Sequence, residues 1–423
     1  MGAQARVANG ADDQIDRWPI HLAKSTGQLR YQPTPGGATG ETSEPSRMLP
    51  GVPVGLFDTR TPLEPLREEI FEAITAVVDD SRFILGPNVA AFEQEFAAYL
   101  GARHAVGVAN GTEAITIALR AMGVGPGDEV IVPSFTFYAS AVAIPPTGAT
   151  PVFCDIDLET FCVTADTVRA ALTPRTRAVI AVHLFGNVAP VAEIEMLGVP
   201  VLEDAAQAAG SRTQAGRPGA LGTAATFSFF PSKNLGCFGD GGAITTNDPE
   251  LADRVSMLRF HGSRDKVSYE HIGYNSRLDE LQAAILRVQL PHLDTWADGR
   301  RAAGEHYAAA GLGELVALPV ATTGADPAWH LYVVRDPHAD ELAAALSAAG
   351  IGNKIYYRTP VHRQAAMSAY RTSVELPATE EAARTHLAIP MSPVLDAAAA
   401  DEVTQATRAA LAGARAAAVT AAG

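Results

Sequence analysis

The feature that most constrains the fold is an alternation of short apolar runs with helical segments between about residues 104 and 246. HAVGVAN reads as a strand, GTEAITIALRAM as a helix, DEVIVP as a strand and TFYASAVAI as a helix. ATPVFCDI, RAVIAVHLF, VPVLED and AATFSFF are further apolar runs of strand length. This alternation predicts an α/β domain with a mostly parallel mixed sheet, whose ligands bind where the strands end.

The chain divides into three parts. Residues 1–55 are rich in Gly, Pro, Ser, Thr and Gln, so we expect an extended or partly disordered arm. Residues 56–290 hold two helices and then the alternating pattern, which predicts the large domain. Residues 291–423 begin with a long Ala/Arg helix, continue with AWHLYVVR as a strand, DELAAALSAAGIG as a helix and IYYRTPVH as a strand-like run, and end in alanine-rich helix. This last part predicts a smaller α+β domain.

Composition argues against several kinds of partner. The chain has 32 basic and 47 acidic residues, and its net charge of -15 repels nucleic acid and anionic membranes. No apolar run is long enough to span a bilayer, and the N-terminus lacks a signal-peptide pattern. The three cysteines show no metal-ligand spacing and no disulfide framework, so we expect no metal site and a cytoplasmic protein.

A lysine follows the apolar run AATFSFF, within TFSFFPSKNLGCFGDGGAITT (226–246). Lys233 stands in a loop rich in Pro and Gly, where an amine can form a Schiff base with an aldehyde cofactor. An isolated loop lysine is more often simply solvated. Here the preceding strand, the hydroxyl of Ser228 and the Gly-rich segment that follows favour a functional site.

An acidic residue ends another apolar run, in VPVLEDAAQAAG. The chemistry of pyridoxal phosphate (PLP) needs a carboxylate at the pyridine nitrogen, which keeps the ring able to accept electrons. Asp204 is placed for that role, and Gln207 follows three residues later. Asp204 could instead be an ordinary helix N-cap.

Two weaker signals accompany these. Gly111 and Thr112, in VANGTEAITIAL, lie where a strand meets a helix start, so their N–H groups could hold a phosphate with help from Ser228. An ordinary helix start has the same appearance. Phe137 or Tyr138, in PSFTFYAS, could stack on a flat ring, although an aromatic there is more often part of the core.

The blocks NGTEAI, PSFTF, GATPVFCDID, EDAAQAAG, FSFFPSKNLG, GDGGAI and YNSRLDELQAAIL together resemble the DegT/DnrJ/EryC1/StrS family of PLP-dependent sugar aminotransferases. The resemblance runs from about Pro62 to about Pro393. It implies the aspartate-aminotransferase architecture, PLP fold type I, and a homodimer with shared active sites.

By this resemblance, Lys233 is the Schiff-base lysine and Asp204 the partner of the pyridine nitrogen. Gln207 touches the phenolic oxygen of the cofactor, and Phe137 stacks on its ring. The residues expected around the phosphate are Gly111, Thr112, Ser228 and, from the neighbouring subunit, Asn275.

The resemblance also implies transfer of an amino group from L-glutamate to a nucleotide-linked keto-sugar, such as a dTDP-3-keto- or 4-keto-6-deoxyhexose. Candidate substrate contacts are His183, Arg264, Tyr356 and His362. Positive charge for the diphosphate could come from Arg264, Lys354, Arg358 and Arg363, although each of these taken singly is more often an ordinary surface charge.

Other functions stay open on the same fold. Some relatives are dehydratases that carry histidine at the Schiff-base position, and the lysine at 233 favours transamination. A cyclitol aminotransferase and a non-catalytic regulatory protein are further alternatives, because fold does not fix function.

Overall fold

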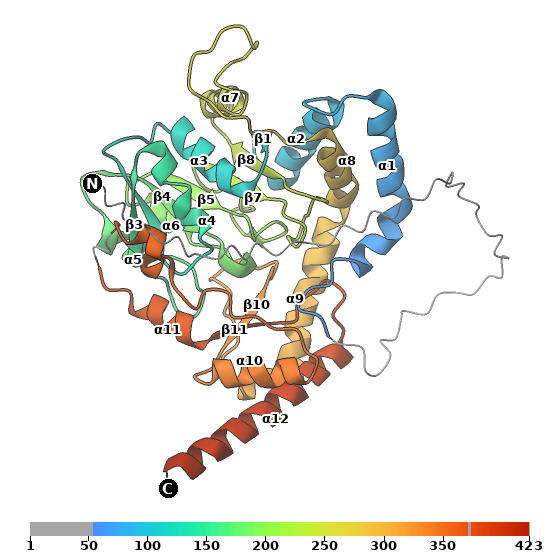
Figure 1. Cartoon of the computed structure of the whole chain (residues 1–423), viewed down its shortest axis with the longest axis vertical. Coiled ribbons are helices and arrows are strands. Elements are labelled where there is room, and N and C mark those ends of the chain that lie inside the picture. Colours follow the sequence, from blue (N-terminus) through green and yellow to red (C-terminus); the bar gives the residue numbers. More distant parts are fainter. Residues whose placement is uncertain (1–53, 371–373, 423) are drawn as a thin grey trace, which may run out of the picture. The chain divides into compact units, whose positions relative to one another are not determined.

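The computed structural model describes residues 54–370 and 374–422, with side chains up to residue 412. The expected arm, 1–55, therefore lies almost wholly outside the described residues. The centre of the described part is a seven-stranded sheet (Figure 1). Its strands, in spatial order, are β1 (His104–Val108), β8 (Gly242–Thr246), β7 (Ala224–Ser228), β5 (Val201–Asp204), β4 (Thr176–Val182), β2 (Glu129–Pro133) and β3 (Thr150–Cys154).

The sheet is mixed in the way the sequence predicts. From β7 to β3 all neighbouring strands are parallel, and only β8 runs antiparallel to its two neighbours, β1 and β7. Both faces of the sheet are buried, because alternate residues of β4 pack in two different hydrophobic clusters. Ile180 and Val182 pack on one face, and Val179 and Ala181 pack on the other. Strands buried on both faces read as continuous apolar runs, which explains why the sequence pattern was clear.

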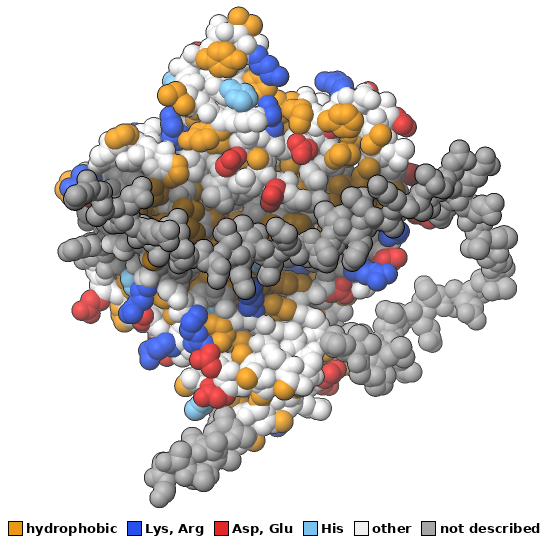
Figure 2. Space-filling model, viewed as in Figure 1, with side chains coloured by type: hydrophobic (Ala, Val, Ile, Leu, Met, Phe, Trp, Pro, Cys, Tyr) orange, Lys and Arg blue, Asp and Glu red, His pale blue; other side chains and the backbone are white. Residues whose placement is uncertain are grey.

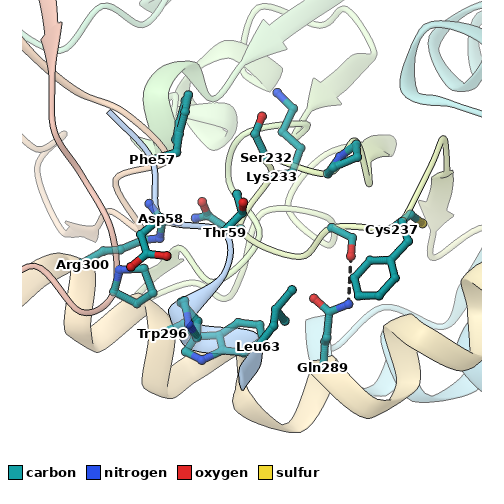
Figure 3. Close-up of a pocket in the computed structure, with 16 residues that line it drawn as sticks. Phe57, Asp58, Thr59, Leu63, Ser232, Lys233, Cys237, Gln289, Trp296 and Arg300 are labelled. Atoms are coloured by element: carbon teal, nitrogen blue, oxygen red, sulfur yellow. Dashed lines mark hydrogen bonds between the residues drawn. The ribbon is translucent and has the colours of Figure 1, made fainter. Parts of the chain in front are cut away.

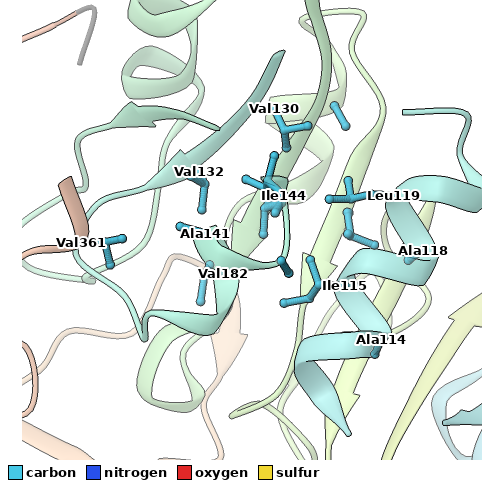
Figure 4. Packing of buried hydrophobic residues seen from close by; sticks show 14 of the residues in the cluster. Ala114, Ile115, Ala118, Leu119, Val130, Val132, Ala141, Ile144, Val182 and Val361 are labelled. Carbon is cyan, nitrogen blue, oxygen red and sulfur yellow. The ribbon is translucent and has the colours of Figure 1, made fainter. Parts of the chain in front are cut away.

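Helices cover both faces of the sheet. α3 (Gly111–Ala121) and α7 (Pro249–Leu258) pack in one cluster, and α2 (Pro87–Leu100), α5 (Ala165–Ala171), α6 (Val191–Glu195) and α8 (Glu280–Gln289) pack in clusters on the other. Figure 4 shows Ala114, Ile115, Ala118 and Leu119 of α3 directed at sheet residues such as Val130. A fully buried Leu or Ile contributes about 1.5–3 kcal/mol, so this face anchors the start of α3 firmly.

The C-terminal part packs around a small antiparallel pair, β10 (Tyr332–Arg335) and β11 (His386–Ile389). α9 (Leu293–Ala309), α10 (Ala339–Ala348) and α12 (Ala397–Ala422) share one hydrophobic cluster with it. The boundary at residue 290 stays a prediction. The other elements are α1 (Arg67–Asp80), α4 (Ala139–Val142), α11 (Pro377–Thr385), β6 (Arg212–Thr213), β9 (Ala325–Asp326) and short 3-10 turns, one of them at Val361–Arg363.

One predicted strand is wrong. IYYRTPVH forms no strand, and only the preceding Lys354 makes a bridge, to Ala388. The Tyr357 N–H donates to Nε2 of His386, a side chain, so it does not extend a ladder. Pro360 lacks an N–H and the next residues turn into a 3-10 helix, so the segment is an irregular wall.

A loop of residues 260–275 projects beyond α7 (Figures 1 and 2). Its apolar side chains are exposed: Val267 is 80%, Tyr269 61% and Ile272 84% exposed. Among the helices that the structure describes, none is long and apolar enough to cross a membrane.

Candidate active site

A cavity of about 380 Å³ opens where the central parallel strands end. β5 ends at Asp204 and β7 ends at Ser228. Because these neighbouring strands are parallel, their C-terminal ends lie at the same edge of the sheet. The cavity is lined by seven of the residues that the sequence assigns to catalysis or cofactor binding: Gly111, Thr112, Phe137, Asp204, Gln207, Ser228 and Lys233.

The Asp204 carboxylate is buried and held in place. Ser140 Oγ donates to its Oδ2 (2.7 Å), and the Ala206 N–H donates to its Oδ1 (3.2 Å). Residues 205–211 form turns and no helix, so Asp204 is not a helix N-cap. A carboxylate fixed in this way has lone pairs left for a further donor in the cavity.

Lys233 stands in a tight turn, in which its N–H donates to the Phe230 carbonyl (2.8 Å). Burial lowers the pKa of its amine to about 8, while the charge of Asp204 acts in the opposite direction. Burial disfavours the charged form of lysine, so a large share of the amine is neutral near pH 8. A neutral amine is the form that attacks an aldehyde and that accepts a proton.

The start of α3 forms a narrow cradle with the end of β7. Asn110 Oδ1 accepts the Glu113 N–H (2.9 Å), and the N–H groups of Gly111 and Thr112 precede the first intrahelical bond. A Cβ on Gly111 would lie 2.7 Å from Ser228 Cβ, closer than side chains tolerate. Only glycine leaves this cradle open, and the free N–H groups at the helix start are donors suited to a phosphate.

We expect Gly111→Ala to weaken phosphate binding, because the added methyl group displaces Ser228 from the cradle. The Kd of the apoprotein for PLP should rise roughly 10-fold or more, in line with the loss of one charge-assisted hydrogen bond. Gly125→Ala is the matched control, since nothing lies within 4 Å of its Cβ. Equal PLP affinity of the two variants, measured by absorbance titration, would show that the phosphate binds elsewhere.

Two further cavity residues differ in how they are held. Gln207 Oε1 accepts the Phe185 N–H (2.6 Å), and its Nε2 donates to Tyr357 Oη (3.3 Å). Phe137 is 58% exposed and lines the cavity, so it is not the core aromatic that was the alternative. Its ring is free to stack on a flat ligand.

Of the four expected substrate contacts, the structure brings only Tyr356 to the cavity. His183 is fully buried instead, because its Nε2 pairs with Glu203 (2.8 Å) and its Nδ1 accepts the Ala189 N–H (3.0 Å). His362 binds Ser134 Oγ through Nδ1 (2.6 Å) and Glu380 through Nε2 (3.1 Å). Both histidines therefore have structural partners within this chain.

Arg264 and Asn275 also lie outside the cavity. Arg264 sits on the projecting loop, where it pairs with Asp253 and Glu270. Asn275 is exposed at the base of that loop, opposite Phe260. The role of Asn275 in a neighbouring subunit's site stays a prediction.

The cavity also holds residues that sequence reasoning left out of the site. Ser140, which orients Asp204, and Tyr357, which contacts Gln207, are examples. Phe57 and His330 line the cavity too, with their rings stacked at 5.8 Å. Ser140 stands three residues after Phe137, a helical spacing that could have pointed to it.

A lysine and an aspartate at neighbouring strand ends, beside a phosphate cradle, define a site of the aminotransferase type. The model of the DegT/DnrJ/EryC1/StrS aminotransferase family matches residues 64–408. The chain belongs to this family, which confirms the resemblance, the fold class and the prediction of a transaminase.

Several known proteins are similar to this chain. A dTDP-3-amino-3,4,6-trideoxy-alpha-D-glucose transaminase from Streptomyces venezuelae is 47% identical over 362 residues, 84% of this chain and 95% of that protein. A pleiotropic regulatory protein from Geobacillus stearothermophilus is 46% identical over 351 residues, 81% of this chain and 94% of that protein.

Solved structures agree with this assignment. S. venezuelae DesV, in complex with a ketimine intermediate, superimposes with a TM-score of 0.81 at 46% identity, over 84% of this chain and 98% of that one. Bacillus subtilis ntda with bound cofactor PMP, the aminated form of PLP, gives 0.75 at 29% identity, over 82% of each chain.

Proposed function

We propose that this chain transfers the amino group of L-glutamate to the keto group of a dTDP-linked 6-deoxyhexose, at C-3 in preference to C-4. The observation that carries this proposal is the placement of Lys233 and Asp204 in one cavity of a sugar aminotransferase fold. The choice of C-3 is supported by the similar transaminase, whose name places the amino group at that carbon. The expected cofactor, PLP, is confirmed by the family and its structures.

Each part of the cavity has a separate task in this reaction. When bound, PLP supplies a ring that accepts electrons from the reacting carbon. The Asp204 carboxylate, fixed by Ser140, would hold a proton on the ring nitrogen. Gly111, Thr112 and Ser228 would bind the phosphate, and Phe137 would lie against the ring. These contacts orient the reacting atoms, which lowers the entropic part of the barrier.

Lys233 would carry the proton. Its neutral amine would take the proton from the α-carbon of the donor as a base and would then deliver it as an acid to the carbon that binds the transferred nitrogen. Water would then release the 2-oxoacid before the keto-sugar binds, and Lys233 and Asp204 would repeat their tasks in reverse, with release of one water. This order predicts ping-pong kinetics.

We expect the rate of PLP uptake by the apoprotein to rise with pH through about 8, because the attacking amine of Lys233 must be neutral. An ordinary lysine would place this midpoint near 10.4. Stopped-flow absorbance between pH 6.5 and 10.5 measures it. A midpoint above 10 would mean that the amine is solvated and not buried as described.

Product analysis tests the proposed reaction. The holoenzyme is incubated with L-glutamate and, in parallel, with the dTDP-3-keto and dTDP-4-keto sugars, and the products are identified by mass spectrometry and NMR. Amination at C-3 alone is the expected result. Amination at C-4 alone would refute the choice of carbon, a dehydrated sugar would refute amino transfer to it, and an unchanged sugar would refute the proposed substrate.

A regulatory role is the second candidate, because one relative is named a regulatory protein. The two candidate functions differ in whether the cavity catalyses repeated reactions. A regulatory protein need not convert substrate, so repeated release of 2-oxoglutarate in the presence of a keto-sugar would exclude a purely regulatory function.

The enzyme is further proposed to be a cytoplasmic homodimer with shared sites. Asn275 lies outside its own cavity, and the projecting loop beside it exposes Val267 and Ile272. Exposed apolar side chains that are gathered on one loop favour an interface there. Cys154, Cys162 and Cys237 are free and buried, which suits a reducing compartment.

Mixing two inactive variants tests the shared site. A heterodimer of Lys233→Ala and Asn275→Ala keeps one intact site only if Asn275 acts across the interface. Mixed and refolded protomers should then recover activity. No recovery, or a monomer in sedimentation, would refute the arrangement.

A further inference from the structure

A second cavity, of about 160 Å³, lies beside the loop that carries Lys233. Its walls come from residues 57–63, loop 231–238 and α9. Figure 3 shows Leu63 and Trp296 at one end of it, while the Lys233 amine points away from them. The volume suffices for several waters or one small ion.

Arg300 of α9 lines this cavity without a negative partner among the residues that the structure describes. Its side chain is buried, Nη1 donates to the Trp329 carbonyl (3.2 Å), and Nε has no hydrogen-bond partner among the described residues. By contrast, the adjacent Arg301 pairs with Asp298. Burial lowers the pKa of Arg300 to about 10. A buried cation without a counter-charge is costly, so a compensating anion is expected.

The groups nearest to Arg300 do not supply that anion. His330 has an unpartnered Nδ1, and its pKa is held well below the usual range by burial and by the positive charges of Lys233 and Arg300. Asp58 lines the cavity, but its Oδ1 accepts the N–H groups of Arg60 (3.0 Å) and Thr61 (2.8 Å). No described carboxylate lies within ion-pair distance of Arg300. The cavity wall therefore carries one buried cation, Arg300, and one carboxylate, Asp58, that are not paired with each other.

We propose that this cavity binds one small monovalent anion, chloride or a carboxylate, on the Arg300 guanidinium. The anion would neutralise the buried charge and join α9 to loop 231–238. It would therefore stabilise the segment that positions Lys233 without contacting the amine itself. This site is separate from the phosphate cradle, which lies at the start of α3.

Calorimetry of the holoenzyme at constant ionic strength tests the proposal. Sodium chloride and sodium acetate are compared with sodium HEPES, whose sulfonate is too bulky for the cavity. The melting temperature should rise by about 2 °C in chloride or acetate relative to HEPES, as expected for an anion at a concentration well above its Kd. A rise in acetate alone would assign a carboxylate ligand. Equal melting in all three salts would mean that water alone fills the cavity, and would overturn the proposal.

Matched variants assign the effect to Arg300. Arg300→Met should abolish the anion-specific rise, whereas Arg301→Met, with the same change of net charge on the same helix, should keep it. If Arg300→Met does not fold, Arg300→Lys retains a charge and should keep a smaller rise. An unchanged rise in both Arg300 variants would overturn the proposal.

The Asp58→Asn variant distinguishes a bound external anion from an ion pair between Asp58 and Arg300. If an external anion neutralises Arg300, removing the carboxylate from the cavity should strengthen anion binding. If Asp58 itself pairs with Arg300 in solution, the variant should melt lower in HEPES, and wild type should show no anion-specific rise. That combination would contradict the proposed site.

Discussion

Lys233→Ala is expected to abolish amino transfer while leaving the fold intact. Proton transfer by a positioned side chain typically contributes 10²–10⁴-fold, so kcat should fall by roughly that factor from this step alone. The variant also loses the covalent attachment point, and PLP should dialyse away more readily. Release of 2-oxoglutarate from L-glutamate in the presence of the keto-sugar measures kcat.

Lys266→Ala is the control, because Lys266 lies on the projecting loop over the Phe260 ring, outside the cavity. It should keep near wild-type kcat. A Lys233→Ala variant with kcat within 10-fold of wild type would show that another group moves the proton, and the assignment of Lys233 would have to be abandoned.

Asp204→Asn is expected to have the second largest effect. Asparagine can keep the local geometry if its oxygen accepts the Ala206 N–H and its amide donates to Ser140 Oγ, whose hydroxyl then turns to Thr136 Oγ1. The neutral amide nevertheless cannot hold a proton on the ring nitrogen. Removing a preorganised electrostatic contact of this kind costs roughly 10²–10³-fold in kcat. Steady-state kinetics with saturating L-glutamate and keto-sugar measure it.

The matched control is Asp298→Asn, an exposed aspartate paired with Arg301 on α9. It should leave kcat unchanged. Full activity of Asp204→Asn would mean that the ring nitrogen needs no anionic partner, which would contradict the assignment of this residue.

The sheet and the cofactor side of the site could be predicted because they follow from local pattern. Strands buried on both faces give apolar runs, and Asp204 and Ser228 stand at the ends of two such runs. Parallel pairing then brings the strand ends to one edge, and the loop after β7 adds Lys233.

The substrate side depends on tertiary contacts that no local pattern reports. A buried His183 with its Glu203 partner has the same sequence signature as an accessible histidine. The Tyr356–Tyr357 segment is rich in strand-forming residues, yet the Tyr357 N–H donates to the His386 side chain and not to the backbone of a neighbouring strand. The ion pair between Arg264 and Asp253 likewise depends on how the loop folds back on α7, which the sequence pattern does not predict.

The most direct test of the central claim is the visible absorption spectrum of the purified holoenzyme, taken before and after addition of L-glutamate and then of a dTDP-keto-sugar. The account predicts a yellow band from PLP bound to Lys233, its conversion by L-glutamate to the spectrum of the aminated cofactor, and its return when the keto-sugar accepts the amino group. A protein that shows no such band, even after PLP is supplied, or a band that L-glutamate leaves unchanged, would contradict the account.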